Sequence, residues 1–174
     1  IPYVIVNQLT KEGFWPDDTV ANSIRNGYTN ARKVFFTCKN NQLLMERQLG
    51  ICLAHVARHC NPIAGVPRNI QLDFPPILNG EYHLACPSRL ITLHKGQDLL
   101  FEVLQQKKWQ QRKLIINLYG DGPNKQQLIQ LKAHYKIKNI NFCGYMTDVT
   151  NIWRKNHGII MPSHMEGVPI VVLG

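Results

Sequence analysis

Short apolar runs alternate with segments of helical periodicity over the second half of the chain, and this alternation constrains the fold more than any other feature. We expect strands at 82–87, 114–119, 139–143 and 158–161, and helices at 97–107, after residue 123 and at 148–154. The run at 114–119 is almost continuously apolar, as strands buried on both faces are. The pattern predicts an α/β fold in which a parallel sheet carries helices on both faces.

The first part of the chain has a shorter version of the same pattern. Apolar runs at 1–6 and 33–38 alternate with helical patterns that begin at Pro16-Asp17 and at Asn40. A stretch with several prolines, ending at Pro75-Pro76, then interrupts the periodicity and is interpreted as a linker. We therefore divide the chain into 1–76, which includes the linker, and 77–174. The chain opens in a strand without Met and stops in a helix-like segment, so both parts are expected to be incomplete.

The chain is basic, with 20 Lys and Arg against 11 Asp and Glu and a net charge of +9 over 174 residues. Such an excess favours phosphorylated ligands, anionic lipid surfaces or nucleic acid. No zinc-finger spacing or RNA-binding strand signature is present, so nucleic acid is not an expected partner. No apolar run has the length of a membrane span, and the N-terminus does not resemble a signal peptide. We expect a cytoplasmic protein, and peripheral contact with the inner face of the membrane is left open.

Five scattered cysteines, an odd number, are interpreted as reduced and buried thiols of a cytosolic protein. Cys52, His55, His59 and Cys60 include the residue types that bind zinc. Because their segment is short and runs into Asn61 and a proline, a strand leading to the linker is favoured. No metal site is predicted.

Candidate binding residues lie where predicted strands end. Arg89 and Lys95-Gly96 precede a helix, where a guanidinium fork and an ammonium can hold the two phosphates of a diphosphate. Taken alone, these two cations are more simply interpreted as solvated surface charges. Gly120-Asp121-Gly122-Pro123 is not a dinucleotide fingerprint, because Lys125 occupies the third glycine position. We interpret it as a tight turn, with Pro123 at the first helical position, that lets a ligand approach the backbone.

The segment after the last predicted strand combines a serine, an acid and a glycine. Ser163, Glu166 and Gly167 stand in a Ser-x-x-Glu-Gly-x-Pro pattern that ends at Pro169. A carboxylate and free backbone N–H groups at the start of a helix suit a sugar and a phosphate together.

In chain order, Arg89, Lys95-Gly96, the Gly-Asp-Gly-Pro turn, Gly144 and the Ser-x-x-Glu-Gly-x-Pro segment resemble the donor-binding half of the family-4 retaining glycosyltransferases. These group 1 enzymes have the B-type architecture of two Rossmann-like domains. The resemblance covers 82–174 well, and 1–76 is similar in layout to the end of the acceptor-side domain. It implies a hexosyltransferase of polysaccharide biosynthesis that moves a sugar from a nucleotide-diphosphate donor to a glycan or lipid-linked acceptor with retention of configuration. The donor is a substrate, and no cofactor is implied.

The resemblance also implies roles for particular residues. The catalytic set is Arg89 and Lys95, which would pair with the donor diphosphate, and Glu166, which would bind sugar hydroxyls. Backbone at Tyr145 and Met146 would face the base, and the amides of Gly167 and Val168 would meet phosphate. The full set of donor-binding residues is Gly96, Gly120, Gly122, Gly144, Tyr145, Met146, Ser163, Gly167 and Val168.

One position departs from the pattern of the family. Eight positions after Glu166, where the family has a second carboxylate for the ribose hydroxyls, this chain has Gly174, its last residue. Either the protein departs from the pattern here, or the chain was cut at this point. A non-catalytic nucleotide-binding or scaffolding module of the same fold is therefore kept as an alternative. The chain by itself is expected not to transfer sugar, because an acceptor cleft needs two complete domains.

Overall fold

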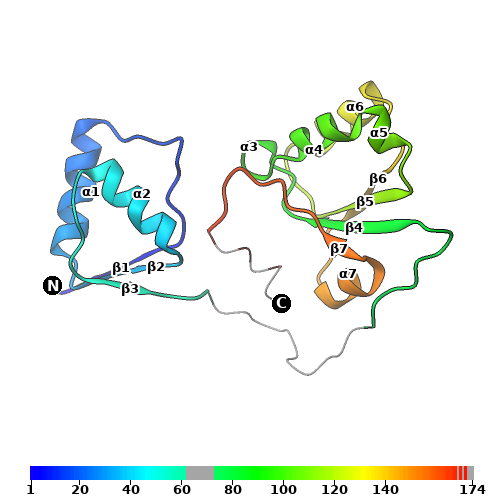
Figure 1. Cartoon of the computed structure of the whole chain (residues 1–174). Helices are drawn as coiled ribbons and strands as arrows, with labels where there is room; N and C mark the ends of the chain where they lie inside the picture. The colour runs from blue at the N-terminus through cyan, green and yellow to red at the C-terminus, as the bar shows by residue number, and fades with distance from the viewer. Residues whose placement is uncertain (62–72, 168, 170, 172–174) are drawn as a thin grey trace. The chain divides into compact units, whose positions relative to one another are not determined.

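The computed structural model describes residues 1–61, 73–167, 169 and 171. It divides into two compact units, of which the first comprises Ile1–Ile63 with Met165–Ile170 and the second comprises Ala64–His164 with Val171–Gly174. Each unit has its own parallel sheet (Figure 1). The assignment of the two parts to acceptor and donor stays a prediction.

The first unit is a three-stranded parallel sheet in the order β1-β2-β3. Its strands are β1 (Val4–Asn7), β2 (Lys33–Phe36) and β3 (Val56–Arg58). They are connected by α1 (Asp18–Asn30) and α2 (Lys39–Leu49). Both helices lie on the same face of the sheet (Figure 1), as expected when successive right-handed crossovers run in one direction.

Local signals explain most of the element boundaries in this unit. The Asp17 side chain accepts a hydrogen bond from the Val20 N–H and caps α1, close to the predicted start. Helix α2 begins one residue before Asn40, which is therefore not its cap, and it ends at Gly50 with a left-handed φ of +62°. Strand β3 confirms that the segment around residues 52–60 is extended rather than helical.

The second unit has four parallel strands in the order β6-β5-β4-β7. Its elements are β4 (Tyr82–Pro87), α3 (Thr92–Lys95), α4 (Gln97–Leu104), α5 (Lys107–Gln110), β5 (Leu114–Tyr119), α6 (Lys125–His134), β6 (Ile140–Gly144), α7 (Val149–Lys155) and β7 (Gly158–Ile159). The bounds of β4 and β5 agree with the sequence prediction. The single helix expected at 97–107 is instead two, because Gln106 has an extended backbone between α4 and α5.

Helices cover both faces of this second sheet, which confirms the predicted fold class. One face contributes Ile116 and Leu118 to a core with Phe101 and Leu128, from α4 and α6. The other face packs against α7, where Ala85, Tyr119 and Ile152 form a smaller buried cluster. The alternation of side chains along β5 directs the two sets to opposite faces.

The order in which strands are added to the sheet reverses at β4. Strands β5 and β6 follow β4 on one side, and the chain then returns to place β7 on the other side. Accordingly α4 and α6 lie on one face and α7 on the other (Figure 1). Sheets of this kind bind ligands beyond the carboxyl ends of the strands where the order reverses.

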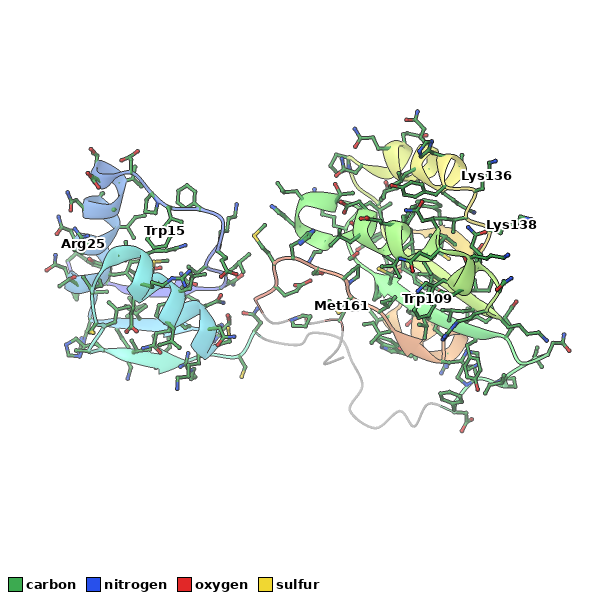
Figure 2. The ribbon with its side chains drawn as sticks, turned by 45° about the horizontal axis from the view of Figure 1, so that its top comes forward. Trp15, Arg25, Trp109, Lys136, Lys138 and Met161 are labelled. Carbon is green, nitrogen blue, oxygen red and sulfur yellow. The ribbon has the colours of Figure 1, made fainter. Side chains whose placement is uncertain are left out.

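The three tryptophans differ in burial. Trp109 packs on the larger core, with the Arg112 guanidinium 4.5 Å from the centre of its ring. Trp153, in α7, packs on the smaller cluster. Trp15 is exposed and stacks with Arg47 at 5.8 Å. Figure 2 labels Trp15 and Trp109 among the side chains of their units.

None of the helices in the described parts of the chain has both the length and the apolar character needed to cross a bilayer.

The prediction of buried thiols is wrong for three of the five cysteines. All five are free, but Cys52, Cys60 and Cys143 are exposed, whereas Cys38 is half-buried and Cys86 is buried. Cys52 and Cys60 lie outside the strands, on either side of β3, and Cys143 lies on the edge strand β6 on the face opposite to Phe142, which packs on the larger core. Burial raises the pKa of the Cys86 thiol to about 11.

These differences predict the order of thiol alkylation. At about pH 8, Cys86 should stay unmodified in the folded chain, because its raised pKa keeps the thiol protonated and the core excludes the reagent. Cys52 and Cys60 should be alkylated first. Peptide mass mapping after brief treatment with iodoacetamide, with and without urea, measures this order. Modification of Cys86 as fast as Cys52 in the folded chain would contradict the assigned burial.

Candidate functional site

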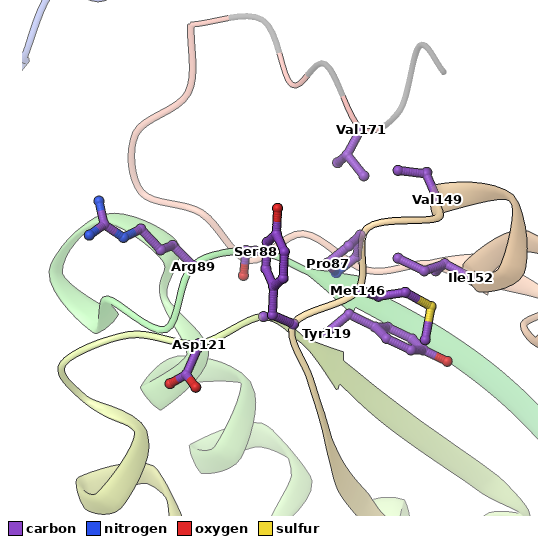
Figure 3. Close-up of a pocket in the computed structure, with 11 residues that line it drawn as sticks. Pro87, Ser88, Arg89, Tyr119, Asp121, Met146, Val149, Ile152 and Val171 are labelled. Atoms are coloured by element: carbon purple, nitrogen blue, oxygen red, sulfur yellow. The ribbon is translucent and has the colours of Figure 1, made fainter. Parts of the chain in front are cut away.

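A cavity of about 390 Å³ lies at the carboxyl ends of β4, β5 and β6 in the second unit (Figure 3). Four of the predicted site residues line it, namely Arg89, Gly120, Tyr145 and Met146. The sequence prediction missed other lining residues, which include Pro87, Ser88, Tyr119, Asp121, Val149 and Ile152. Most of these residues lie at or just after the end of a strand, or in the first turn of α7. Their position after a predicted strand was the signal in the sequence that could have identified them.

The cavity has an apolar side and a cationic edge. The side chains of Met146, Val149 and Ile152 gather on the apolar side together with the Tyr119 ring (Figure 3). Arg89 lies at the other edge and is exposed. An apolar surface beside a guanidinium can hold a planar ring and an anion that belong to one ligand.

The loop after β4 is firmly held although Arg89 itself is exposed. The N–H of Ser88 donates to the Tyr119 carbonyl at 2.9 Å, and the N–H of Leu90 donates to the Asp121 carbonyl at 3.0 Å. The Leu90 side chain is buried in the larger core. Among the described residues, no carboxylate forms an ion pair with Arg89. The backbone is therefore fixed while the guanidinium faces solvent.

Two glycines allow the loops after β4 and β5 to touch. A Cβ at Gly120, where φ is +137°, would lie 2.2 Å from the Ser88 carbonyl oxygen. A Cβ at Gly122 would lie 2.5 Å from the Leu90 carbonyl oxygen. These glycines thus have a packing role that the sequence did not reveal, and their role in donor binding stays a prediction.

The turn after β5, Gly120-Asp121-Gly122-Pro123, differs from the prediction in one respect. Helix α6 begins at Lys125 with Asn124 as its cap, so Pro123 precedes the helix instead of occupying its first position. The Asn124 N–H bonds the Leu90 carbonyl, and its side chain accepts from the Thr92 N–H. These two bonds tie the start of α6 to the loop after β4.

Asp121 is the acidic group beside the cavity. Its carboxylate accepts a hydrogen bond from the Gly122 N–H at 2.7 Å and pairs with Lys125 at 3.1 Å. The backbone N–H of Gly122, and then Lys125, lower the pKa of Asp121 from its usual value. Asp121 is therefore ionised at neutral pH, and Lys125 offsets its charge, so the edge near Arg89 remains suited to an anion.

Lys95 and Gly96 lie at the same end of the sheet. Lys95 is close enough to Cys86, near the carboxyl end of β4, to oppose the rise in the pKa of its thiol that burial causes. Gly96 has a φ of +61°, and a Cβ there would lie 2.2 Å from the Pro162 carbonyl oxygen. The α3–α4 junction therefore touches the segment after β7, one residue before Ser163.

The other predicted residues divide between the two units. Gly144 ends β6 with a φ of +74° and turns the chain toward Tyr145 and Met146. Glu166 and Gly167 belong to the segment that groups with the first unit, where a Cβ at Gly167 would meet the Gln8 carbonyl oxygen at 2.3 Å. Val168 and Gly174 lie outside the described residues. The combination of Glu166 with Arg89 and Lys95 stays a prediction.

Polar side chains support the floor of the cavity. Asn156 donates from Nδ2 to the Tyr119 hydroxyl at 3.0 Å, and its Oδ1 accepts from Asn117 at 2.8 Å. Burial raises the pKa of Tyr119, so this side chain is a neutral phenol at physiological pH.

Within the described ranges, no three His, Cys, Asp or Glu side chains lie close enough together to hold a metal ion.

The packing role of the glycines predicts a graded loss of stability. Gly120→Ala should lower the free energy of unfolding of the second unit by at least about 2 kcal/mol, because it combines a strained φ with a backbone clash. Gly144 also has a left-handed φ, but a Cβ there would meet no atom within 4 Å, so Gly144→Ala should lower the free energy of unfolding by less. Gly13→Ala, with no neighbour within 4 Å, should be close to neutral. Urea denaturation followed by circular dichroism measures the series, and equal losses for Gly120→Ala and Gly13→Ala would contradict the packing role.

Comparison with solved structures shows the fold. A mutant of TarM from S. aureus, solved in complex with Fondaparinux, alpha-GlcNAc-glycerol and UDP, matches with a TM-score of 0.72 at 17% identity, over 98% of this chain and 34% of that chain. HepE from Anabaena, in complex with UDP and glucose, matches with a TM-score of 0.69 at 18% identity, over 93% of this chain and 46% of that chain. At these identities the matches show the fold alone, an α/β fold of the B-type with Rossmann-like domains. The chain spans about a third to a half of their length.

A search of curated protein sequences found no significant match. The family model described as glycosyl transferases group 1 matches residues 72–173, which is more than half of the chain. The predicted group 1 resemblance is thereby confirmed. This chain belongs to the group 1 family of glycosyl transferases.

Proposed function

We propose that the second unit binds the nucleotide-diphosphate sugar of a family-4 retaining glycosyltransferase. The observation that carries this proposal is the cavity at the carboxyl ends of β4, β5 and β6, apolar on one side and bordered by Arg89 on the other. The family match supports a sugar transferase of this group. The solved structures of TarM, HepE and the pneumococcal O-GlcNAc transferase GtfA were all obtained with UDP, which supports a nucleotide ligand for this fold.

The two sides of the cavity suit the two parts of a nucleoside diphosphate. The base would lie against Met146 and the Tyr119 ring, with the backbone at Tyr145 reading its edge. The diphosphate would extend toward Arg89, with Lys95 as the second cation at the end of β4. Asp121 does not oppose this placement, because Lys125 offsets its charge.

The proposed reaction transfers a hexosyl group with retention. The bond between the anomeric carbon and the diphosphate oxygen breaks, and the acceptor hydroxyl forms a new bond to that carbon on the same face. The acceptor proton passes to an oxygen of the leaving diphosphate. Arg89 and Lys95 would stabilise the charge that gathers on this leaving group, and Glu166 would bind hydroxyls of the donor sugar. The proposal assigns no metal or cofactor to these steps.

The acceptor and the location belong to the same proposal. We propose a glycan or lipid-linked acceptor, in keeping with the family match, and a cytoplasmic location with peripheral membrane contact, to which the net charge of +9 is suited. The alternative is a nucleotide-binding or scaffolding module of the same fold without catalysis. Both functions require the same donor cavity, so one experiment tests their common part.

Arg89→Ala should weaken the binding of UDP to the chain by about 1.5–3 kcal/mol, or roughly 10- to 150-fold in Kd, because a charge-assisted contact to phosphate is lost. Isothermal titration calorimetry measures this change. Lys138→Ala is the matched control, since this exposed lysine (Figure 2) precedes β6 and so lies at the amino ends of the parallel strands, away from Arg89, and its loss changes the net charge equally. Equal affinities of the native chain and Arg89→Ala would count against the site.

A further inference from the structure

We propose that Gln97 is a positioning residue for the donor diphosphate, because it fixes the backbone of the loop that carries Arg89. The proposal rests on the donor site proposed above and adds a residue to it that touches no ligand. It concerns only contacts within the second unit.

Gln97 is the first residue of α4, and its polar side chain is completely buried, with a relative exposure of 0%. Its Nε2 donates to the Arg89 carbonyl at 2.9 Å and to the Ser88 hydroxyl at 3.0 Å. Because a carbonyl oxygen can only accept, the amide nitrogen must face Arg89, which settles the orientation of the side chain. A single side chain thus contacts two consecutive residues of the loop.

The amide oxygen of Gln97 indicates that this residue does more than stabilise the fold. The Oε1 of Gln97 is buried and has no hydrogen-bond partner among the described residues. A buried acceptor without a partner costs free energy of folding, and an apolar side chain of similar size would avoid that cost. An apolar side chain could not, however, donate a hydrogen bond to the Arg89 carbonyl, as Nε2 of Gln97 does.

Gln97 completes a clamp around the loop after β4. Gly120 and Gly122 contact the loop from the turn after β5, and the Leu90 side chain anchors it in the core. Gln97 holds the Arg89 carbonyl itself, whose other bond comes from the Ile91 N–H two residues along. Since the guanidinium faces solvent, its position depends on its own backbone, and small shifts of a charged group reduce its contact with a ligand.

The test is a double-mutant cycle on the UDP affinity of the full chain, measured by calorimetry. Gln97→Met keeps the length and the helix propensity of the side chain and removes both hydrogen bonds. In the native background it should raise the Kd for UDP by about three- to tenfold. In the Arg89→Ala background it should change the Kd by less than about twofold, because the group it positions is gone.

Two controls separate positioning from general stability. Ile116→Val lowers the stability of the core without touching the loop, and Gln130→Met makes the same substitution at an exposed site on α6. Neither should change UDP affinity. If Gln97→Met does not fold, Gln97→Leu replaces it, because that side chain is apolar, favours helix and cannot donate to the Arg89 carbonyl.

Each outcome decides the proposal. Loss of affinity with Gln97→Met that disappears in the Arg89→Ala background supports it. An equal loss in both backgrounds, or no loss in the native background while Arg89→Ala weakens binding, overturns the role of Gln97 and leaves the donor site intact. Absence of UDP binding to the native chain overturns both proposals.

Discussion

The second unit depends on close contact between backbones at glycines. The loops after β4 and β5 meet at Gly120 and Gly122, and the α3–α4 junction meets the segment after β7 at Gly96. A side chain at any of these positions would lie within 2.5 Å of a carbonyl oxygen. These contacts bring backbone from several strand ends to one edge of the sheet, where the cavity forms.

The path of the chain through the sheet explains why the cavity has two unlike sides. Helix α7 lies on the face opposite to α4 and α6, and its first turn contributes Val149 and Ile152 to the apolar wall. The loop between β4 and α3 carries Arg89, and its Leu90 side chain is buried in the core on the other face. One reversal of strand order therefore produces an apolar surface and a cation at neighbouring positions.

Patterns that depend on near neighbours in the sequence were predictable. The apolar runs located β4 and β5 with correct bounds, and the position after a strand end located Arg89, Gly120, Tyr145 and Met146 beside the cavity. Contacts between distant segments were not predictable. The need for Gly122, the burial of Gln97 and the exposure of Cys143 each depend on which strands and loops become neighbours, and local composition does not specify this.

The central claim is that one ligand spans the apolar wall and the cation at the end of β4. The most direct measurement is an experimental structure of the chain soaked with UDP. We expect the uracil ring against Met146 and the Tyr119 ring, with a phosphate oxygen within hydrogen-bond distance of the Arg89 guanidinium. UDP bound at another surface, with this cavity unchanged, would contradict it.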